Sequence, residues 1–247
     1  MEALLEIRNI TKSFGHVQAL NKVNLQLFPS EVLALVGDNG AGKSTLIKIL
    51  SGVYDLDQGE IYINGESVLI RSPFQAKKIG IASVYQDLAL VDVFNGAENI
   101  YLGIEPLWKG VFINYKKMMN DAQSALKQLR IKIPSLKTLV RDLSGGQRQS
   151  VAIARSLVRG GNIFLLDEPT AALGVEQTAK VNEIISDLRT NMKSVILISH
   201  NLENVFQVAD RICVLRRGEL VGLKKKEETT KEEIVGLITG AIEGQTY

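Results

Sequence analysis

A glycine-rich stretch near residue 40 reads Gly37-Asp38-Asn39-Gly40-Ala41-Gly42-Lys43-Ser44-Thr45. It matches G-x-x-x-x-G-K-[ST], the pattern of a phosphate-binding loop (P-loop). The apolar run 32–36 precedes it as a predicted buried strand, and the apolar positions between 46 and 50 predict a helix after it. A P-loop needs this strand–loop–helix context. A glycine-rich turn with a surface lysine is the alternative.

The residue types in this loop suit phosphate chemistry. Glycines allow successive backbone N–H groups to face a phosphate, and the N-terminus of the following helix adds partial positive charge. Lys43 is expected to reach the β- and γ-phosphates of a nucleotide, and the Ser44 hydroxyl is expected to bind Mg²⁺. All nine residues from Gly37 to Thr45 are therefore candidate nucleotide contacts.

A second acidic element is expected in the stretch Ile163-Phe164-Leu165-Leu166-Asp167-Glu168. Four apolar residues followed by two carboxylates predict a buried strand that delivers charge at its C-terminal end. Adjacent residues of a strand point to opposite faces, so the two carboxylates are expected to take different roles. Asp167 is predicted to hold Mg²⁺ and Glu168 to polarise the attacking water as the general base. A strand that simply ends at solvent is the alternative.

The pattern along the chain predicts an α/β fold. The runs 32–36, 163–166 and 195–198 are apolar on both faces, as in a parallel sheet covered by helices on both sides. Alternating apolar residues at 23–27 and 61–63 predict half-buried strands of an antiparallel flank. Between about 87 and 157 the pattern turns mostly helical, which predicts a helical subdomain inserted into the core.

Composition limits the function classes. The 247 residues include 29 Lys plus Arg and 27 Asp plus Glu, for a formal net charge of +2, so a protein that coats nucleic acid is not indicated. Cys213 is the single cysteine, which excludes an internal disulfide, and its apolar neighbours predict a buried position. The acidic N-terminal segment is unlike a signal peptide, and no apolar run reaches the ~18 residues of a membrane span. The chain is expected to be cytoplasmic.

The segment Leu143-Ser144-Gly145-Gly146-Gln147 carries the resemblance to a known family. Together with the P-loop and Asp167-Glu168, it resembles the ATP-binding cassette (ABC) ATPases, whose signature motif is LSGGQ, over residues 4 to 222. The resemblance implies one ABC ATPase domain over 1–247, with an ATP-binding core in 1–86 and 158–247 and a helical subdomain in 87–157. Small residues at a helix N-terminus also suit anion binding. In this family the segment 144–147 binds the ATP held by the opposing subunit, which implies a homodimer in the ATP-bound state.

The same resemblance assigns three further residues. Phe14 matches the aromatic residue that stacks on adenine, usually a tyrosine. Gln86 matches the glutamine that touches Mg²⁺ and links the core to the helical subdomain. His200 matches the switch histidine that contacts the γ-phosphate, and so counts with Glu168 and Lys43 among the expected catalytic residues.

One position departs from the family pattern. After residues 168–170 the family often reads Ser-Ala-Leu-Asp, whereas this chain reads Ala171-Ala172-Leu173-Gly174. The missing aspartate helps to couple the two ATP sites, so Gly174 puts the detail of that coupling in doubt. This version resembles bacterial monosaccharide importers of the single-cassette, ribose or fructose type.

The resemblance implies an ATPase subunit that powers uptake of a small solute, expected to be a monosaccharide. Its implied partners are transmembrane permease subunits and, indirectly, an extracytoplasmic solute-binding protein, with no nucleic acid. It would then lie on the inner face of the cell membrane through the permease. The same motifs also occur in three alternative functions: an ABC ATPase that acts on ribosomes or DNA, a regulatory nucleotide-binding module without turnover, and an exporter.

Overall fold

The central sheet carries the apolar runs from which an α/β fold is predicted. In the computed structural model, which describes residues 2–131, 133 and 135–244, its strand order is β12-β11-β3-β10-β9-β6. The strands are β3 (Val32–Val36), β6 (Ile81–Val84), β9 (Ile163–Asp167), β10 (Ser194–Ile198), β11 (Arg211–Arg216) and β12 (Glu219–Lys225). The first five pair in parallel, and β12 pairs antiparallel with β11. Every residue of β3 and β10 is buried, which explains why these runs are apolar on both faces.

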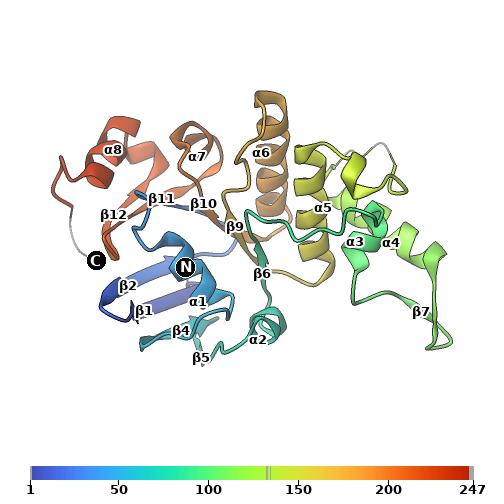
Figure 1. The fold of residues 1–247 in the computed structure, drawn as a ribbon. Coiled ribbons are helices and arrows are strands. Elements are labelled where there is room, and N and C mark those ends of the chain that lie inside the picture. Colours follow the sequence, from blue (N-terminus) through green and yellow to red (C-terminus); the bar gives the residue numbers. More distant parts are fainter. Residues whose placement is uncertain (1, 132, 134, 245–247) are drawn as a thin grey trace.

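A second, antiparallel sheet forms the predicted flank, with the order β2-β1-β4-β5. It consists of β1 (Leu5–Phe14), β2 (Val17–Leu27), β4 (Gln58–Ile63) and β5 (Glu66–Val68). The alternating stretches of the sequence lie in β2 and β4, and β1 separates them. Helix α1 (Lys43–Leu50) contributes Leu46, Ile47, Ile49 and Leu50 to the core that it shares with both sheets (Figure 1).

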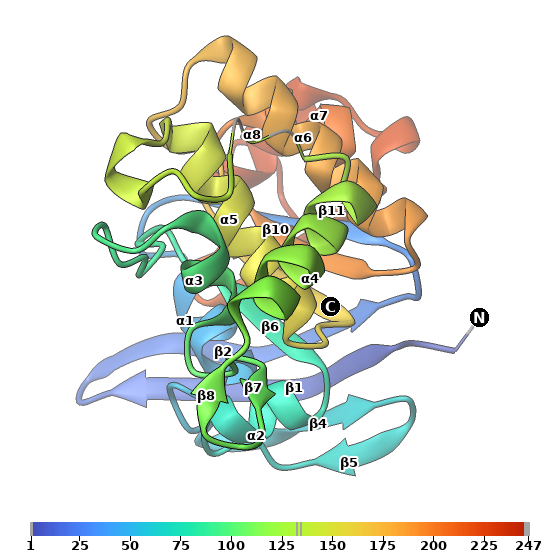
Figure 2. The same ribbon diagram turned by 90° about the vertical axis from the view of Figure 1, so that its right-hand side faces the viewer.

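The helical segment lies between β6 and β9. These two strands are neighbours in the sheet although the helices separate them in the sequence, so the segment is an insertion into the parallel core (Figure 2). It contains α3 (Gly96–Tyr101), α4 (Tyr115–Gln128), the 3-10 turn η1 (Val140–Asp142) and α5 (Gly145–Val158). Their apolar faces form a core with α6 (Val175–Thr190) and the second face of the sheet. The segment also holds a short hairpin of β7 (Leu107–Trp108) and β8 (Phe112–Ile113), which the helical pattern does not predict.

The remaining elements cover the edges of the sheets. Helices α7 (Leu202–Val208) and α8 (Lys231–Thr239) pack on β11 and β12, while α2 (Pro73–Lys78) precedes β6 and the turn η2 (Lys226–Glu228) follows β12. Cys213 in β11 is fully buried, as predicted, and burial raises the pKa of its thiol. Among the described residues, no helix combines the length and the apolar character that crossing a bilayer requires.

Candidate functional site

The candidate residues meet where neighbouring parallel strands end. The P-loop follows β3, His200 follows β10, Asp167 ends β9 with Glu168 directly after it, and Gln86 follows β6. Because β3, β10, β9 and β6 are consecutive in the sheet, their carboxyl ends share one edge. A cavity of about 250 Å³ opens at this edge and is lined by Ala19, Asn39, Gly40, Ala41, Gly42, Lys43, Ser44, Thr45, Gln86, Asp167, Glu168 and Ile198. We refer to it as the P-loop cavity.

Two glycines of the loop stand where no other residue fits. Gly37 and Gly42 have φ values of 151° and 105°. A Cβ atom on Gly37 would lie 2.1 Å from the carbonyl oxygen of Leu215, and one on Gly42 would lie 2.5 Å from that of Ala19. The loop backbone therefore packs closely against β11 at Gly37 and against β2 at Gly42. Other parts of the loop line the P-loop cavity, where a ligand can bind.

The substitution Gly42→Ala is expected to destabilise the fold by about 2–3 kcal/mol, because it adds a backbone clash to an unfavourable φ. Gly40→Ala is the matched control: Gly40 also has a positive φ of 78°, but a Cβ there meets nothing within 4 Å. Its expected cost is the left-handed backbone alone, about 1 kcal/mol. Urea unfolding of both variants measures the difference, and equal losses would contradict the steric account.

Lys43 is held by the loop that surrounds it. Its Nζ donates to the carbonyl oxygens of Gly37 at 2.7 Å and Asp38 at 2.9 Å, and the residue is 8% exposed. Burial lowers the pKa of this ammonium, while the carboxylates of Glu168 and Asp167 oppose the shift. An ammonium has three N–H donors, so the two carbonyls leave one for a ligand in the cavity.

The oxygen donors of the cavity fit a magnesium ion. Burial is the main cause that raises the pKa of Asp167, and the nearby charge of Glu168 raises it further. A hydrogen bond from the Ser44 hydroxyl to the Asp167 carboxylate opposes this shift. Gln86 lines the same cavity. A carboxylate, a hydroxyl and an amide oxygen are hard ligands of the kind Mg²⁺ takes, and a cation beside Asp167 would offset the repulsion from Glu168.

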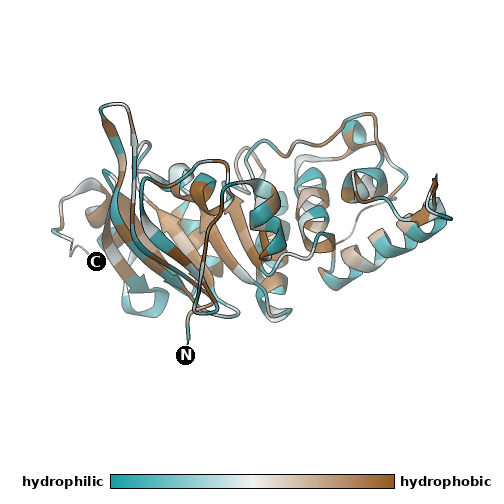
Figure 3. Ribbon diagram, turned by 90° about the horizontal axis from the view of Figure 1, so that it is seen from below, coloured by the Kyte–Doolittle hydropathy of each residue, from teal (hydrophilic) through white to brown (hydrophobic). Residues whose placement is uncertain are grey.

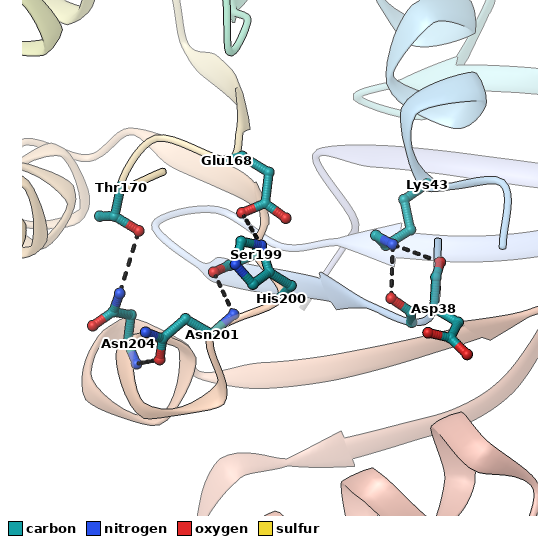
Figure 4. A network of polar contacts seen from close by, with 9 residues as sticks. Asp38, Lys43, Glu168, Thr170, Ser199, His200, Asn201 and Asn204 are labelled. Carbon is teal, nitrogen blue, oxygen red and sulfur yellow. Dashed lines mark hydrogen bonds and ion pairs between the residues drawn. The ribbon is translucent and has the colours of Figure 1, made fainter. Parts of the chain in front are cut away.

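Glu168 is turned out of the strand toward His200. Its φ of 50° is left-handed, its N–H donates to the Ile198 carbonyl, and its Oε2 accepts from His200 Nδ1 at 2.8 Å (Figure 4). A left-handed conformation costs a non-glycine residue about 1–2 kcal/mol, which the neighbouring contacts must offset. The side chain of Glu168 is 16% exposed and that of His200 is 71% exposed. Glu168 thus lines the P-loop cavity, whereas the exposed His200 lines a separate pocket with Thr170 and Asn201.

The signature segment lies elsewhere in the chain. Ser144 caps α5: its Oγ accepts from the N–H of Gln147 at 3.4 Å, and its own N–H donates to the Gln147 side chain at 2.9 Å. A Cβ on Gly145 would lie 2.8 Å from Leu173, and one on Gly146 would lie 3.1 Å from Gln177. The glycines therefore allow α5 to approach α6 closely. None of residues 144–147 lines the P-loop cavity.

Phe14 also lies outside the lining of the P-loop cavity. It ends β1, is 44% exposed, and meets the Tyr54 ring edge-on at 5.2 Å between centroids, with Lys12 Nζ 5.4 Å from its own ring centre. Adenine stacking by Phe14 stays a prediction. Ala19 of β2 lines the cavity instead, and nothing in its sequence neighbourhood singles it out.

Gly174, where the family often has aspartate, is the N-cap of α6. It makes no side-chain capping bond there, and its φ of −71° is open to any residue. The loop before it is held by Asn204, whose Nδ2 donates to Thr170 Oγ1 at 3.2 Å (Figure 4). Glycine at this position leaves the N-terminus of α6 without a side-chain cap.

Comparison with known proteins agrees with this geometry. The ABC transporter family model matches residues 20–171. The chain is 47% identical to the xylose/arabinose import ATP-binding protein of Sulfolobus acidocaldarius, over 97% of this chain and 95% of that protein. It is 40% identical to the fructose import ATP-binding protein of Rhizobium meliloti, over 98% of this chain and 96% of that one. A ribose import ATP-binding protein of Caldanaerobacter subterraneus is 42% identical, and this chain spans about half of its length.

Solved structures show the same architecture. A dimeric bacterial ABC transporter cassette is similar with a TM-score of 0.77 and 27% identity, over 90% of this chain and 98% of that one. An ABC transporter cassette in its ADP conformation has a TM-score of 0.82 over 97% of this chain and 96% of that one, and at 24% identity it supports the fold. The chain therefore belongs to the ABC transporter family, as one of its ATP-binding and ATP-hydrolysing cassettes.

Proposed function

We propose that this chain is the ATPase subunit of an importer that carries a monosaccharide into the cell. One observation carries the proposal: the chain matches two sugar import ATP-binding proteins, for xylose/arabinose and for fructose, over nearly the whole length of both partners. Import ATP-binding subunits work with permease subunits. An extracytoplasmic solute-binding protein would select the sugar, and the ATPase would lie on the cytoplasmic face of the membrane.

Each residue of the P-loop cavity takes a role in ATP hydrolysis under this proposal. The backbone N–H groups of 37–45 bind the phosphates, and Lys43 shifts one or more of its donors from the loop carbonyls to the β- and γ-phosphates. Ser44, Asp167 and Gln86 would hold Mg²⁺, which neutralises phosphate charge when bound. Glu168 takes a proton from the attacking water, and His200 keeps the Glu168 carboxylate in place and contacts the γ-phosphate.

The separation of the two motifs supports a site shared between two chains. Residues 144–147 stand on α5, apart from the P-loop cavity, so a second copy must supply them to the γ-phosphate. We propose a homodimer that closes on MgATP and opens after hydrolysis. Residues 87–157 form its helical subdomain, and Gln86, at the start of the connection from β6, transmits the presence of nucleotide to the permease surface.

A reconstitution experiment tests the proposal. The chain is co-expressed with permease subunits encoded beside its gene and placed in vesicles with the neighbouring solute-binding protein. ATP hydrolysis is expected to rise several-fold when the binding protein carries a pentose or hexose. A rise with amino acids or metal ions and none with sugars would contradict monosaccharide import.

The alternative of a ribosome- or DNA-acting ATPase is not favoured by the near-neutral charge of +2. Filter binding of RNA and DNA at moderate salt separates the two functions. Weak or no retention is expected, and tight binding would count against the importer.

A further inference from the structure

The hairpin β7–β8 projects from the end of the helical segment beside α4 (Figures 1 and 2). Leu107 pairs with Ile113 and Trp108 with Phe112. The turn between them contains Lys109 and Gly110, both with positive φ, as in tight hairpin turns. The hairpin thus forms a projecting finger with a tight turn.

Its apolar side chains are largely exposed. Neighbouring residues of a strand point to opposite faces, so Leu107 and Ile113 cover one face while Trp108 and Phe112 cover the other. All are exposed, together with Val111 at the turn and Tyr115 at the start of α4, by 42% to 75%. None belongs to the three hydrophobic clusters of the fold. An isolated two-stranded hairpin is marginally stable in water, so an apolar surrounding would stabilise this one.

Lysines outnumber acidic residues around the finger. Residues 105–121 contain Lys109, Lys116 and Lys117 together with Glu105 and Asp121, which lie at the two ends of this stretch. Lys109 Nζ lies 4.8 Å from the centre of the Trp108 ring, and Lys117 forms an exposed pair with Asp121 at 3.3 Å. The finger therefore presents aromatic and aliphatic side chains with Lys109 at its turn and Lys116 at the start of α4. Figure 3 shows its hydrophobic colouring at the far end of the molecule.

We propose that this finger inserts into the surface of an anionic lipid bilayer. The hairpin exposes apolar side chains on both of its faces. A flat protein surface would cover only one of these faces, whereas the interface of a bilayer would surround both faces. Trp and Tyr favour the boundary between headgroups and acyl chains, and lysines attract anionic headgroups. The contact is with lipid directly, so it goes beyond docking on a permease and does not depend on the sugar.

The chain contains its own probe, because Trp108 is its single tryptophan. Full-length protein is titrated with protein-free vesicles of phosphatidylglycerol and phosphatidylcholine, or of phosphatidylcholine alone. Trp108 emission is expected to shift to shorter wavelength with the anionic vesicles, and the protein is expected to co-sediment with them. High salt and neutral vesicles are expected to weaken both signals.

Single substitutions test whether the finger is the part of the protein that binds the vesicles. Phe112→Ser keeps the probe and is expected to weaken vesicle binding about tenfold, as is Lys109→Glu. Phe74→Ser is the matched control, because Phe74 is 66% exposed and has Lys78 Nζ 4.8 Å from its ring centre, but lies on α2. Its binding is expected to equal that of the wild type.

Three outcomes would overturn the proposal. These are no emission shift and no co-sedimentation with anionic vesicles, equal binding by Phe112→Ser and wild type, or binding that requires the permease in the vesicle. ATP hydrolysis by the same samples reports separately on the proposed function, because the finger lies outside the P-loop cavity.

Discussion

Glu168→Gln is expected to lower the rate of ATP hydrolysis by about 10²-fold or more, the scale that a lost general base produces. Glutamine keeps the size of the side chain and can still meet His200, but it cannot take a proton from water. The left-handed turn at Glu168 that directs the side chain toward His200 is a backbone feature, so the geometry is expected to persist. Steady-state phosphate release at saturating MgATP measures the effect.

The control for this variant is Glu203→Gln. Glu203 is exposed, pairs with Lys231 rather than with His200, and does not line the P-loop cavity, so hydrolysis is expected to be unchanged. ATP binding by Glu168→Gln is also expected to survive, since Lys43 and the loop amides are untouched. Hydrolysis by Glu168→Gln at the wild-type rate would require another group to be the base.

Lys43→Ala is expected to weaken ATP binding itself, on the order of 10- to 100-fold. Charge-assisted hydrogen bonds contribute about 1.5–3 kcal/mol, and Lys43 is the buried cation of the loop. Titration calorimetry with ATP measures the loss, and a thermal melt without nucleotide checks that the variant folds. Lys225→Ala is the control, because Lys225 forms an exposed pair with Glu228. If Lys43→Ala bound ATP like the control, the ammonium would not contact the phosphates.

Much of the site follows from the sequence because it lies at strand ends. Strands buried on both faces are apolar through their length, so their ends are visible as the first polar residues. Asp167 comes directly after Leu166, and Ser199 and then His200 come after Ile198. Parallel pairing then brings those ends to one edge. The cavity that unites the P-loop with Asp167, Glu168 and Gln86 is a consequence of this order.

Other features depend on contacts that no pattern in the sequence encodes. The hairpin at 107–113 has strands of two residues, too short for an alternating pattern, and its turn is Lys-Gly rather than Asn-Gly. The contact between Glu168 and His200 requires knowledge that β9 and β10 are adjacent and in register. The role of Ala19 arises from how β2 passes the P-loop, which its small apolar side chain does not reveal.

The claim that the ATP site is shared between two chains has one direct test. The mass of Glu168→Gln is measured by size-exclusion chromatography with light scattering, with MgATP, with MgADP and without nucleotide. Under the proposed dimer the γ-phosphate would be attracted to two helix N-termini on different chains, so a dimer is expected with MgATP and a monomer in the other two conditions. Adding Ser144→Arg to Glu168→Gln places a bulky side chain at the α5 N-cap and is expected to leave a monomer in MgATP. A dimer populated equally in all three conditions would contradict a site joined by the γ-phosphate.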